Sequence, residues 1–303
     1  MLLITEFNMM RKIRVFSLFA GIALLFTSSM PVKLNYRQGR YNNVCKDLKN
    51  DVLLYFIFID TRDTSPWTEF DIISTIDSLG VAVNWLHKQA EKNNIDLKIK
   101  TDYYIGNEYA TISRNLPQGT VRESLLEPNL QKGIQSLNKW SDYVSRIAGE
   151  SFYIVNKDGI PQLQNPRDTE RLIAYLRDEY SVESVALLFL VNNYFRNDIS
   201  IALNTLTQDE VEYAIVSYKY PSEIAHNLLH LYGAADLYKT PFRKSEKKIR
   251  LAEELFPNEI MQDPYARNIT RLEISDFTKY LIGWTDEYDE SYESLLTDKF
   301  IRF

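Results

Sequence analysis

The chain has 303 residues, of which 45% are hydrophobic and 13% aromatic, which is enough apolar material for a sizeable core. Its formal net charge is −6 and its pI is near 5.3. No run of lysine and arginine that could grip phosphates appears, so the composition argues against a nucleic-acid-binding protein. The single cysteine, Cys45, excludes an intramolecular disulfide.

The N-terminal residues 1–29 have the order of a secretory signal peptide. Arg11, Lys12 and Arg14 form a basic cluster, residues 15–26 form an apolar run, and small polar residues follow. The run is shorter than the about 20 residues that a membrane-spanning helix needs. We therefore expect cleavage after residue 29 and an exported protein, located in the periplasm, at the cell surface or outside the cell. Stable membrane insertion is not expected after cleavage, and a retained anchor is the alternative.

Hydrophobic periodicity predicts the elements that follow. Residues 30–50 are polar and predict an extended lead-in. Residues 52–59 form a nearly continuous apolar run, typical of a buried strand. An amphipathic helix is expected over residues 71–92, and a strand with one solvent-facing side over residues 96–105. The later expectations are helices at 137–147, 168–180, 222–232 and 275–282, a buried strand at 185–191, and a strand at the sheet edge at 212–218.

Strands and helices alternate through about the first 190 residues, which favours an α/β fold with a mixed, mostly parallel sheet. No linker rich in proline and glycine divides the chain after the lead-in. We therefore expect residues 51–303 to form a single domain with a mainly helical C-terminal part.

The stretch that carries chemistry contains two of the three histidines. His226 and His230 are four residues apart on a predicted helix, so their rings share one face and can bind one zinc ion. Gly233 can end the helix and reverse the chain, after which the carboxylate of Asp236 can reach the same ion. Three protein ligands and one open position are typical of a catalytic zinc site. The third histidine, His87, is interpreted as a packing or surface residue.

The pattern H-x-x-x-H-x-x-G-x-x-D resembles the extended zinc motif of the metzincin peptidases, in the variant with aspartate as the third ligand. The resemblance implies a zincin-like fold with an active-site helix, Zn²⁺ as the cofactor, and a peptide or protein as the partner. It also implies a buried methionine turn, for which Met261 between Pro257 and Pro264 is the candidate. Residues 271–284 are similar to the helix that closes such domains.

The sequence departs from the family at the residue after the first histidine. The family has glutamate there, which takes a proton from the metal-bound water, but this chain has Asn227. An amide cannot act as a general base. Glu223 lies one turn earlier on the metal-facing side, where it can serve as a substitute base, orient a histidine or act as a first-turn charge. Tyr265 is interpreted as a packing residue, with contact to an oxyanion as the alternative.

Three functional hypotheses follow. The first is an exported zinc-binding metzincin-like protein that binds peptide or protein and is an impaired or inactive peptidase. The second is an active zinc metalloendopeptidase with a displaced base, and the third is an exported interaction protein without metal. Cys45 is expected to be a free thiol rather than a cap on the open zinc position.

Overall fold

The computed structural model describes residues 32–35, 45, 47–62, 64–106, 111–117, 130–150, 166–192, 200–203, 211–217, 220–240 and 243–300. The predicted signal peptide lies outside these residues. Among the residues described, no helix combines the length and the apolar character that crossing a membrane requires.

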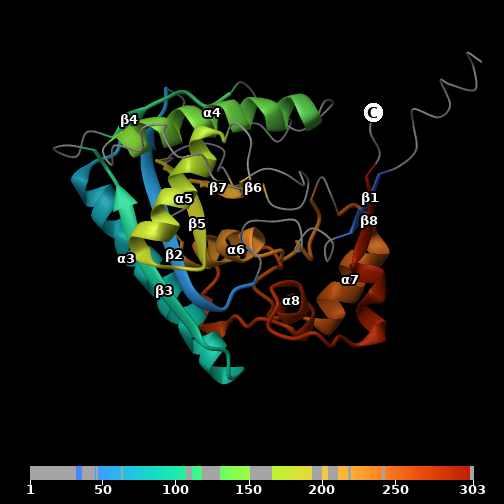
Figure 1. The fold of residues 1–303 in the computed structure, drawn as a ribbon. Coiled ribbons are helices and arrows are strands. Elements are labelled where there is room, and N and C mark those ends of the chain that lie inside the picture. Colours follow the sequence, from blue (N-terminus) through green and yellow to red (C-terminus); the bar gives the residue numbers. More distant parts are fainter. Residues whose placement is uncertain are drawn as a thin grey trace, which may run out of the picture.

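The centre of the molecule is a mixed, mostly parallel sheet, as predicted (Figure 1). Its strand order is β3-β2-β5-β7-β6, with β4 pairing beside β2. All described pairs in this sheet are parallel except β6 with β7, which is antiparallel. The strands are β2 (Asn50–Asp60), β3 (Leu97–Tyr104), β4 (Ile112–Ser113), β5 (Ser184–Val191), β6 (Ser200–Leu203) and β7 (Tyr213–Val216).

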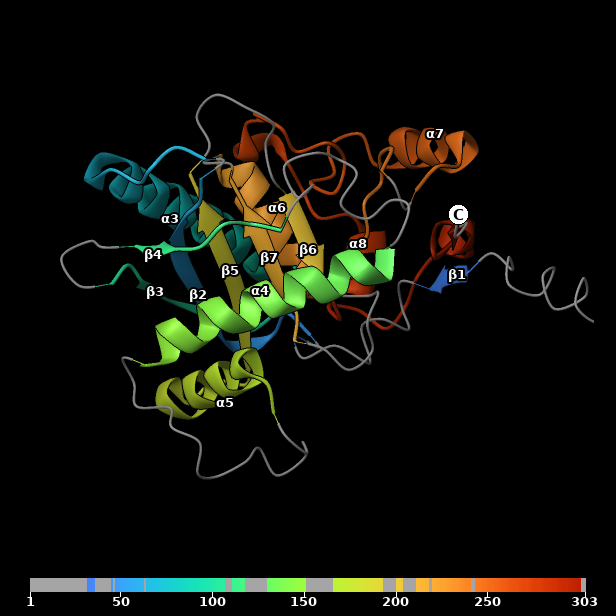
Figure 2. The same cartoon turned by 90° about the horizontal axis from the view of Figure 1, so that it is seen from above.

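The continuous apolar run of β2 reflects burial on both faces of the sheet. Leu54, Phe56 and Phe58 belong to one core cluster, whereas Leu53 and Tyr55 belong to the other. Helices α4 (Leu130–Glu150) and α5 (Asp168–Tyr180) cover one face, and α3 (Glu69–Lys92) and α6 (Pro221–Leu231) cover the other (Figure 2). The strand predicted at residues 96–105 is present as the edge strand β3, but its alternation is interrupted, because Lys100 and Thr101 are both exposed and Leu97 is the one buried residue of the strand.

Helix α3 begins where its sequence allows a capping box. The side chain of Thr68 accepts a hydrogen bond from the backbone N–H of Asp71, and the Asp71 carboxylate accepts one from the backbone N–H of Thr68. Because this reciprocal exchange satisfies N–H groups that have no partner within the helix, it fixes where the element starts. The predicted helix at 71–92 is thus confirmed, two residues longer at its N-terminal end.

The strand predicted at residues 212–218 is present as β7, but its predicted place at the sheet edge is wrong. Strand β7 lies between β5 and β6, and its four residues are all buried. The edge belongs to β6, which pairs antiparallel with β7 in the register Ser200 opposite Val216. Strand β6 is only four residues long, and so short a segment has no clear periodicity in the sequence.

The C-terminal part contains short helices and one strand. Ser275 is the N-cap of α8, because its side chain accepts a hydrogen bond from the N–H of Thr278. The elements are α7 (Glu246–Leu255), η2 (Ile269–Arg271), α8 (Asp276–Leu281), η3 (Glu290–Leu295) and β8 (Thr297–Phe300). Strand β8 pairs antiparallel with β1 (Val32–Asn35), which joins the two ends of the described chain.

The segment before β2 is also attached to this C-terminal part. The N–H of Leu48 donates to the carbonyl of Ile282 at 3.1 Å, and the indole N–H of Trp284 donates to the carbonyl of Leu48 at 2.7 Å. Between them, Gly283 has a φ of +80°, and a Cβ there would lie 2.1 Å from an oxygen of Asp47. A glycine is therefore required at this crossing.

Candidate metal site on helix α6

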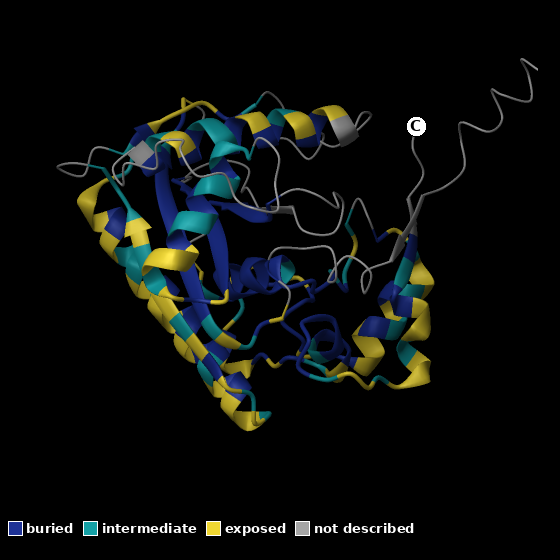
Figure 3. Cartoon of the chain, viewed as in Figure 1, coloured by how far each residue is buried: buried dark blue, intermediate teal, exposed yellow. Residues whose placement is uncertain are grey.

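Helix α6 carries the two histidines of the motif. Pro221 occupies its first turn, where a missing N–H costs nothing. Most of the helix is buried (Figure 3), because its aliphatic residues join the core cluster beneath the sheet. The His226 side chain is 2% exposed and that of His230 is 14% exposed, so only the second ring reaches toward solvent.

The end of α6 depends on Gly233. Its φ is +97°, a conformation that residues with a Cβ rarely adopt. The N–H of Gly233 donates to the carbonyl of His230, and the N–H of Ala234 donates to the carbonyl of Leu229. These bonds close the helix end and turn the chain back along it, which brings Asp236 to the two histidine rings.

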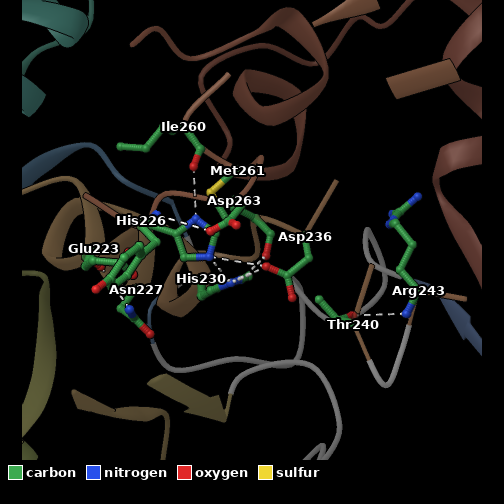
Figure 4. A network of polar contacts seen from close by, with 12 residues as sticks. Glu223, His226, Asn227, His230, Asp236, Thr240, Arg243, Ile260, Met261 and Asp263 are labelled. Atoms are coloured by element: carbon green, nitrogen blue, oxygen red, sulfur yellow. Dashed lines mark hydrogen bonds and ion pairs between the residues drawn. The ribbon is translucent and has the colours of Figure 1, made fainter. Parts of the chain in front are cut away.

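The structure brings the three predicted ligands together (Figure 4). The Nε2 atoms of His226 and His230 are 2.9 Å apart. Oδ1 of Asp236 lies 3.2 Å from Nε2 of His226 and 3.0 Å from Nε2 of His230. These three residues form the candidate metal site. Among the residues that the structure describes, they are the group of histidine, cysteine or acidic side chains whose ligand atoms lie close enough together to hold one ion.

Both imidazole rings are oriented by main-chain carbonyls. Nδ1 of His226 lies 3.0 Å from the carbonyl oxygen of Ile260, and Nδ1 of His230 lies 2.8 Å from that of Ala234. A carbonyl oxygen only accepts hydrogen bonds, so each Nδ1 carries the proton. Each Nε2 of a neutral ring then presents a lone pair toward the other ring and toward Asp236. Three such atoms about 3 Å apart repel one another unless they share a cation or a proton.

The pKa values follow from this arrangement. Burial lowers the pKa of His226, and the neighbouring His230 acts in the same direction. Burial also opposes the charged form of His230, but the charge and hydrogen bond of Asp236 outweigh it and raise the His230 pKa above its usual value. Burial acts against ionisation of Asp236, yet the charge of His230 and the close contacts with both rings hold the pKa of Asp236 well below its usual range.

The donor set and its spacing fit a zinc ion. Tetrahedral zinc with ligands at about 2.0–2.1 Å separates its ligand atoms by about 3.3 Å. The three separations at the candidate site are 2.9, 3.0 and 3.2 Å, so a small outward movement suffices. Two imidazole nitrogens and one carboxylate oxygen are ligands that zinc accepts readily. The fit is independent of any family resemblance.

Asn227 is turned away from the metal ligands. Its Nδ2 donates to the main-chain carbonyl of Glu223 at 2.9 Å, so the amide bonds back onto its own helix. Glu223 is 3% exposed, and its carboxylate does not belong to the group of potential ligands around His226. In Figure 4, Asn227 and Glu223 lie on the opposite side of His226 from Asp236. This contact holds the amide nitrogen of Asn227 on its own helix, away from the three ligands.

The predicted methionine turn lies against the site. Met261 is fully buried, and its carbonyl oxygen accepts the N–H of Leu237, the residue after Asp236, at 2.8 Å. Its neighbour Ile260 supplies the carbonyl that orients His226. The turn therefore contacts the segments of two of the three ligands through consecutive main-chain carbonyls.

Other residues considered in the sequence lie elsewhere. His87 is partly buried and accepts a hydrogen bond from the N–H of Ile99 at 3.0 Å, which joins α3 to β3. Cys45 is buried and free, and its Sγ lies 3.1 Å from the carbonyl oxygen of Val185. Burial raises the pKa of the Cys45 thiol well above its usual value, which makes it unreactive and agrees with a plain free thiol.

Sequence reasoning missed the groups that hold the ligands. The carbonyls of Ile260 and Ala234 orient the two rings, but main-chain groups leave no signature in a motif. Glu259 leads into the turn and was not singled out, although an acidic residue beside a turn expected to be buried was a signal. Tyr265 is half exposed and meets Tyr220 edge to face, with ring centroids 5.7 Å apart, so its packing is a surface contact.

No protein-family model matches the chain. Comparison with curated proteins gives no significant match either. The function must therefore be argued from the residues of the candidate metal site.

Proposed function

We propose that this is an exported zinc-binding protein with a metzincin-like domain, which binds a peptide or protein and is impaired or inactive as a peptidase. One observation carries the metal assignment. The Nε2 atoms of His226 and His230 face each other at 2.9 Å, with Oδ1 of Asp236 within 3.2 Å of both. A divalent ion satisfies all three atoms at once.

The arrangement around α6 supports the metzincin-like part of the proposal. The helix that carries the ligands follows the antiparallel pair at the edge of a mostly parallel sheet. Gly233 turns the chain after the helix, and the buried Met261 lies in a turn that contacts the segment of Asp236. The ligand-carrying helix, the turn at Gly233 and the buried methionine turn are features that the sequence resemblance implies. Zinc bound here would supply a Lewis acid with an open position for a carbonyl or carboxylate oxygen of a peptide.

The presence of Asn227 in place of the family's glutamate supports the proposal that peptides are not cleaved efficiently. A general base or acid contributes roughly 10²- to 10⁴-fold to such a reaction, and an amide supplies neither. Its Nδ2 is already bonded to the carbonyl of Glu223. A peptide ligand would therefore be held by the metal and released uncut.

A test of this proposal compares hydrolysis of an unstructured protein with and without a chelator. The zinc-loaded wild-type protein should show little or no chelator-sensitive cleavage, while retaining zinc. Brisk cleavage that survives Asn227→Ala and is lost in Glu223→Gln would overturn the proposal in favour of an active peptidase with a displaced base.

The alternative without metal has one observation in its favour. Nε2 of His230 lies 2.9 Å from Nε2 of His226 and 3.0 Å from Oδ1 of Asp236, so a proton on it can hold the three groups together, and the charge of Asp236 raises the pKa of His230 in support. The protein would then be an exported interaction protein whose site contains no ion. Zinc uptake separates the two possibilities, because a metal must displace this proton to bind.

A further inference from the structure

We propose that Glu259 is a positioning residue for the candidate metal site, holding the turn whose carbonyls orient the metal ligands. The inference rests on the proposed zinc binding by His226, His230 and Asp236. Glu259 contacts none of these ligands, so its effect is transmitted through the main chain of Ile260 and Met261.

The Glu259 carboxylate joins two segments at the end of the turn. It is fully buried. Oε1 accepts the N–H of Met261 at 3.1 Å, and Oε2 accepts the N–H of Ser275, the N-cap of α8. One side chain therefore fixes the peptide between Ile260 and Met261 relative to α8, whose N-cap lies fourteen residues after Met261.

That same peptide and the next one make the contacts that hold two ligands. The carbonyl of Ile260, which belongs to this peptide, accepts from Nδ1 of His226 at 3.0 Å. The carbonyl of Met261, which belongs to the next peptide, accepts the N–H of Leu237 at 2.8 Å, next to Asp236. A rotation of the peptide that releases the Met261 N–H would move both carbonyls. The ring of His226 and the carboxylate of Asp236 would lose their fixed orientation together.

Main-chain pairing alone does not hold this part of the turn. The N–H of Ile260 donates to the carbonyl of Glu273, and the N–H of Glu273 donates to the carbonyl of Asn258, which forms an isolated parallel bridge. The bridge ends at Ile260. The N–H of Met261 lies beyond it and is held by the Glu259 side chain.

Burial of a carboxylate is unfavourable for stability, so filling the core does not explain Glu259. Burial raises its pKa to about 7, although hydrogen bonds from Ser275 and Met261 act in the opposite direction. An apolar side chain would avoid that cost, but it would leave two N–H groups without this acceptor. The two acceptor oxygens are what the position requires.

The experiment measures zinc affinity and the visible spectrum of the cobalt-substituted protein for the wild type and Glu259→Gln. Glutamine keeps the size of the side chain but has one acceptor oxygen, and its amide nitrogen would face the other N–H. We expect zinc affinity to fall at least tenfold, in the range seen when groups that orient metal ligands are removed. The cobalt absorption bands should also change, which a loss of stability alone would not cause in folded protein.

Asp71→Asn is the matched control. Asp71 is another buried carboxylate that accepts a main-chain N–H, in this case at the start of α3. This variant should lower the melting temperature while zinc affinity and the cobalt spectrum stay as in the wild type. If Glu259→Gln does not fold, Glu259→Asp, whose shorter carboxylate cannot reach both donors, should fold and show the same change more weakly.

If Glu259→Gln or Glu259→Asp binds zinc as tightly as the wild type and has the same cobalt spectrum, the positioning role is overturned. The proposed zinc binding would stand in that case. An equal loss of affinity in Asp71→Asn would also overturn it, because the effect would then be general destabilisation. A wild-type protein that takes up no zinc would overturn this inference and the proposed function together.

Discussion

Nδ1 of His230 lies 2.8 Å from the main-chain carbonyl oxygen of Ala234, only four residues later in the chain. The contact is local, whereas the corresponding nitrogen of His226 reaches Ile260, 34 residues away. The local contact requires the chain to reverse as soon as α6 ends. That reversal occurs at Gly233, whose φ is +97°.

Replacing Gly233 with alanine should therefore affect stability and metal binding together. A Cβ in this conformation costs about 1–2 kcal/mol of folding free energy. Displacement of Ala234 and Asp236 should weaken zinc binding about tenfold or more. Denaturant unfolding and competition with a zinc chelator measure the two effects.

Gly80→Ala provides the control, because Gly80 lies inside α3 and a methyl group there would meet no neighbouring heavy atom within 4 Å. That variant should gain about 0.5–1 kcal/mol of stability, since alanine favours a helix interior. Its zinc affinity should not change. Equal zinc affinity in Gly233→Ala and wild type would show that the turn does not position the ligands.

Asp236→Asn should lower the pKa of His230. Burial disfavours the charged imidazole, and the negative charge of Asp236 is what raises the pKa above 6.5. In the metal-free protein, the proton on His230 stabilises the fold below pH 6.5, and this contribution is lost as the pH rises through the raised pKa. The variant should lose that pH-dependent contribution. NMR titration of the histidine rings in the metal-free protein measures the shift, and an unchanged His230 pKa would contradict the assigned ion pair.

Much of the fold could be predicted because its strongest patterns are local. The buried run that became β2 and the periodic segment that became α3 were both evident in the sequence. The short strands β4 and β6 were missed, because elements of two and four residues carry no periodicity. The position of β7 inside the sheet was missed for the same reason, since it depends on pairing with β6.

The candidate site, too, could be predicted only in part from the sequence. His226, His230 and Asp236 were predicted because their spacing along a helix and turn determines where their side chains lie. The support from Glu259 could not be predicted, because it depends on the approach of Ser275 to the turn. The direction of the Asn227 amide was also unpredictable, since it results from a choice between two hydrogen-bonding partners.

Asn227→Glu tests whether the missing base is the main obstacle to cleavage. If the rest of the site is preserved, the variant should cleave an unstructured protein in a chelator-sensitive manner, roughly 10²- to 10⁴-fold above the wild type. Asn227→Gln is the matched control, because it has the length of glutamate without its basicity, and it should stay inactive. Cleavage by both variants would contradict the role assigned to a carboxylate here.

Export predicts a specific mature N-terminus. The basic cluster and apolar run within residues 11–29 should be removed, which leaves a chain that begins near Met30. Mass spectrometry of the protein isolated from the envelope or the medium of its native host measures this end. A cytoplasmic protein that retains residues 11–29 would refute the prediction.

The most direct test of the account is a zinc titration of the metal-free wild-type protein beside His230→Ala. His226, His230 and Asp236 should bind one zinc ion per chain in the wild type, because their ligand atoms already lie within 4.8 Å of one another. His230→Ala should lose this binding while remaining folded. A folded wild-type protein that takes up no zinc at neutral pH would contradict the account and favour the proton-bridged site.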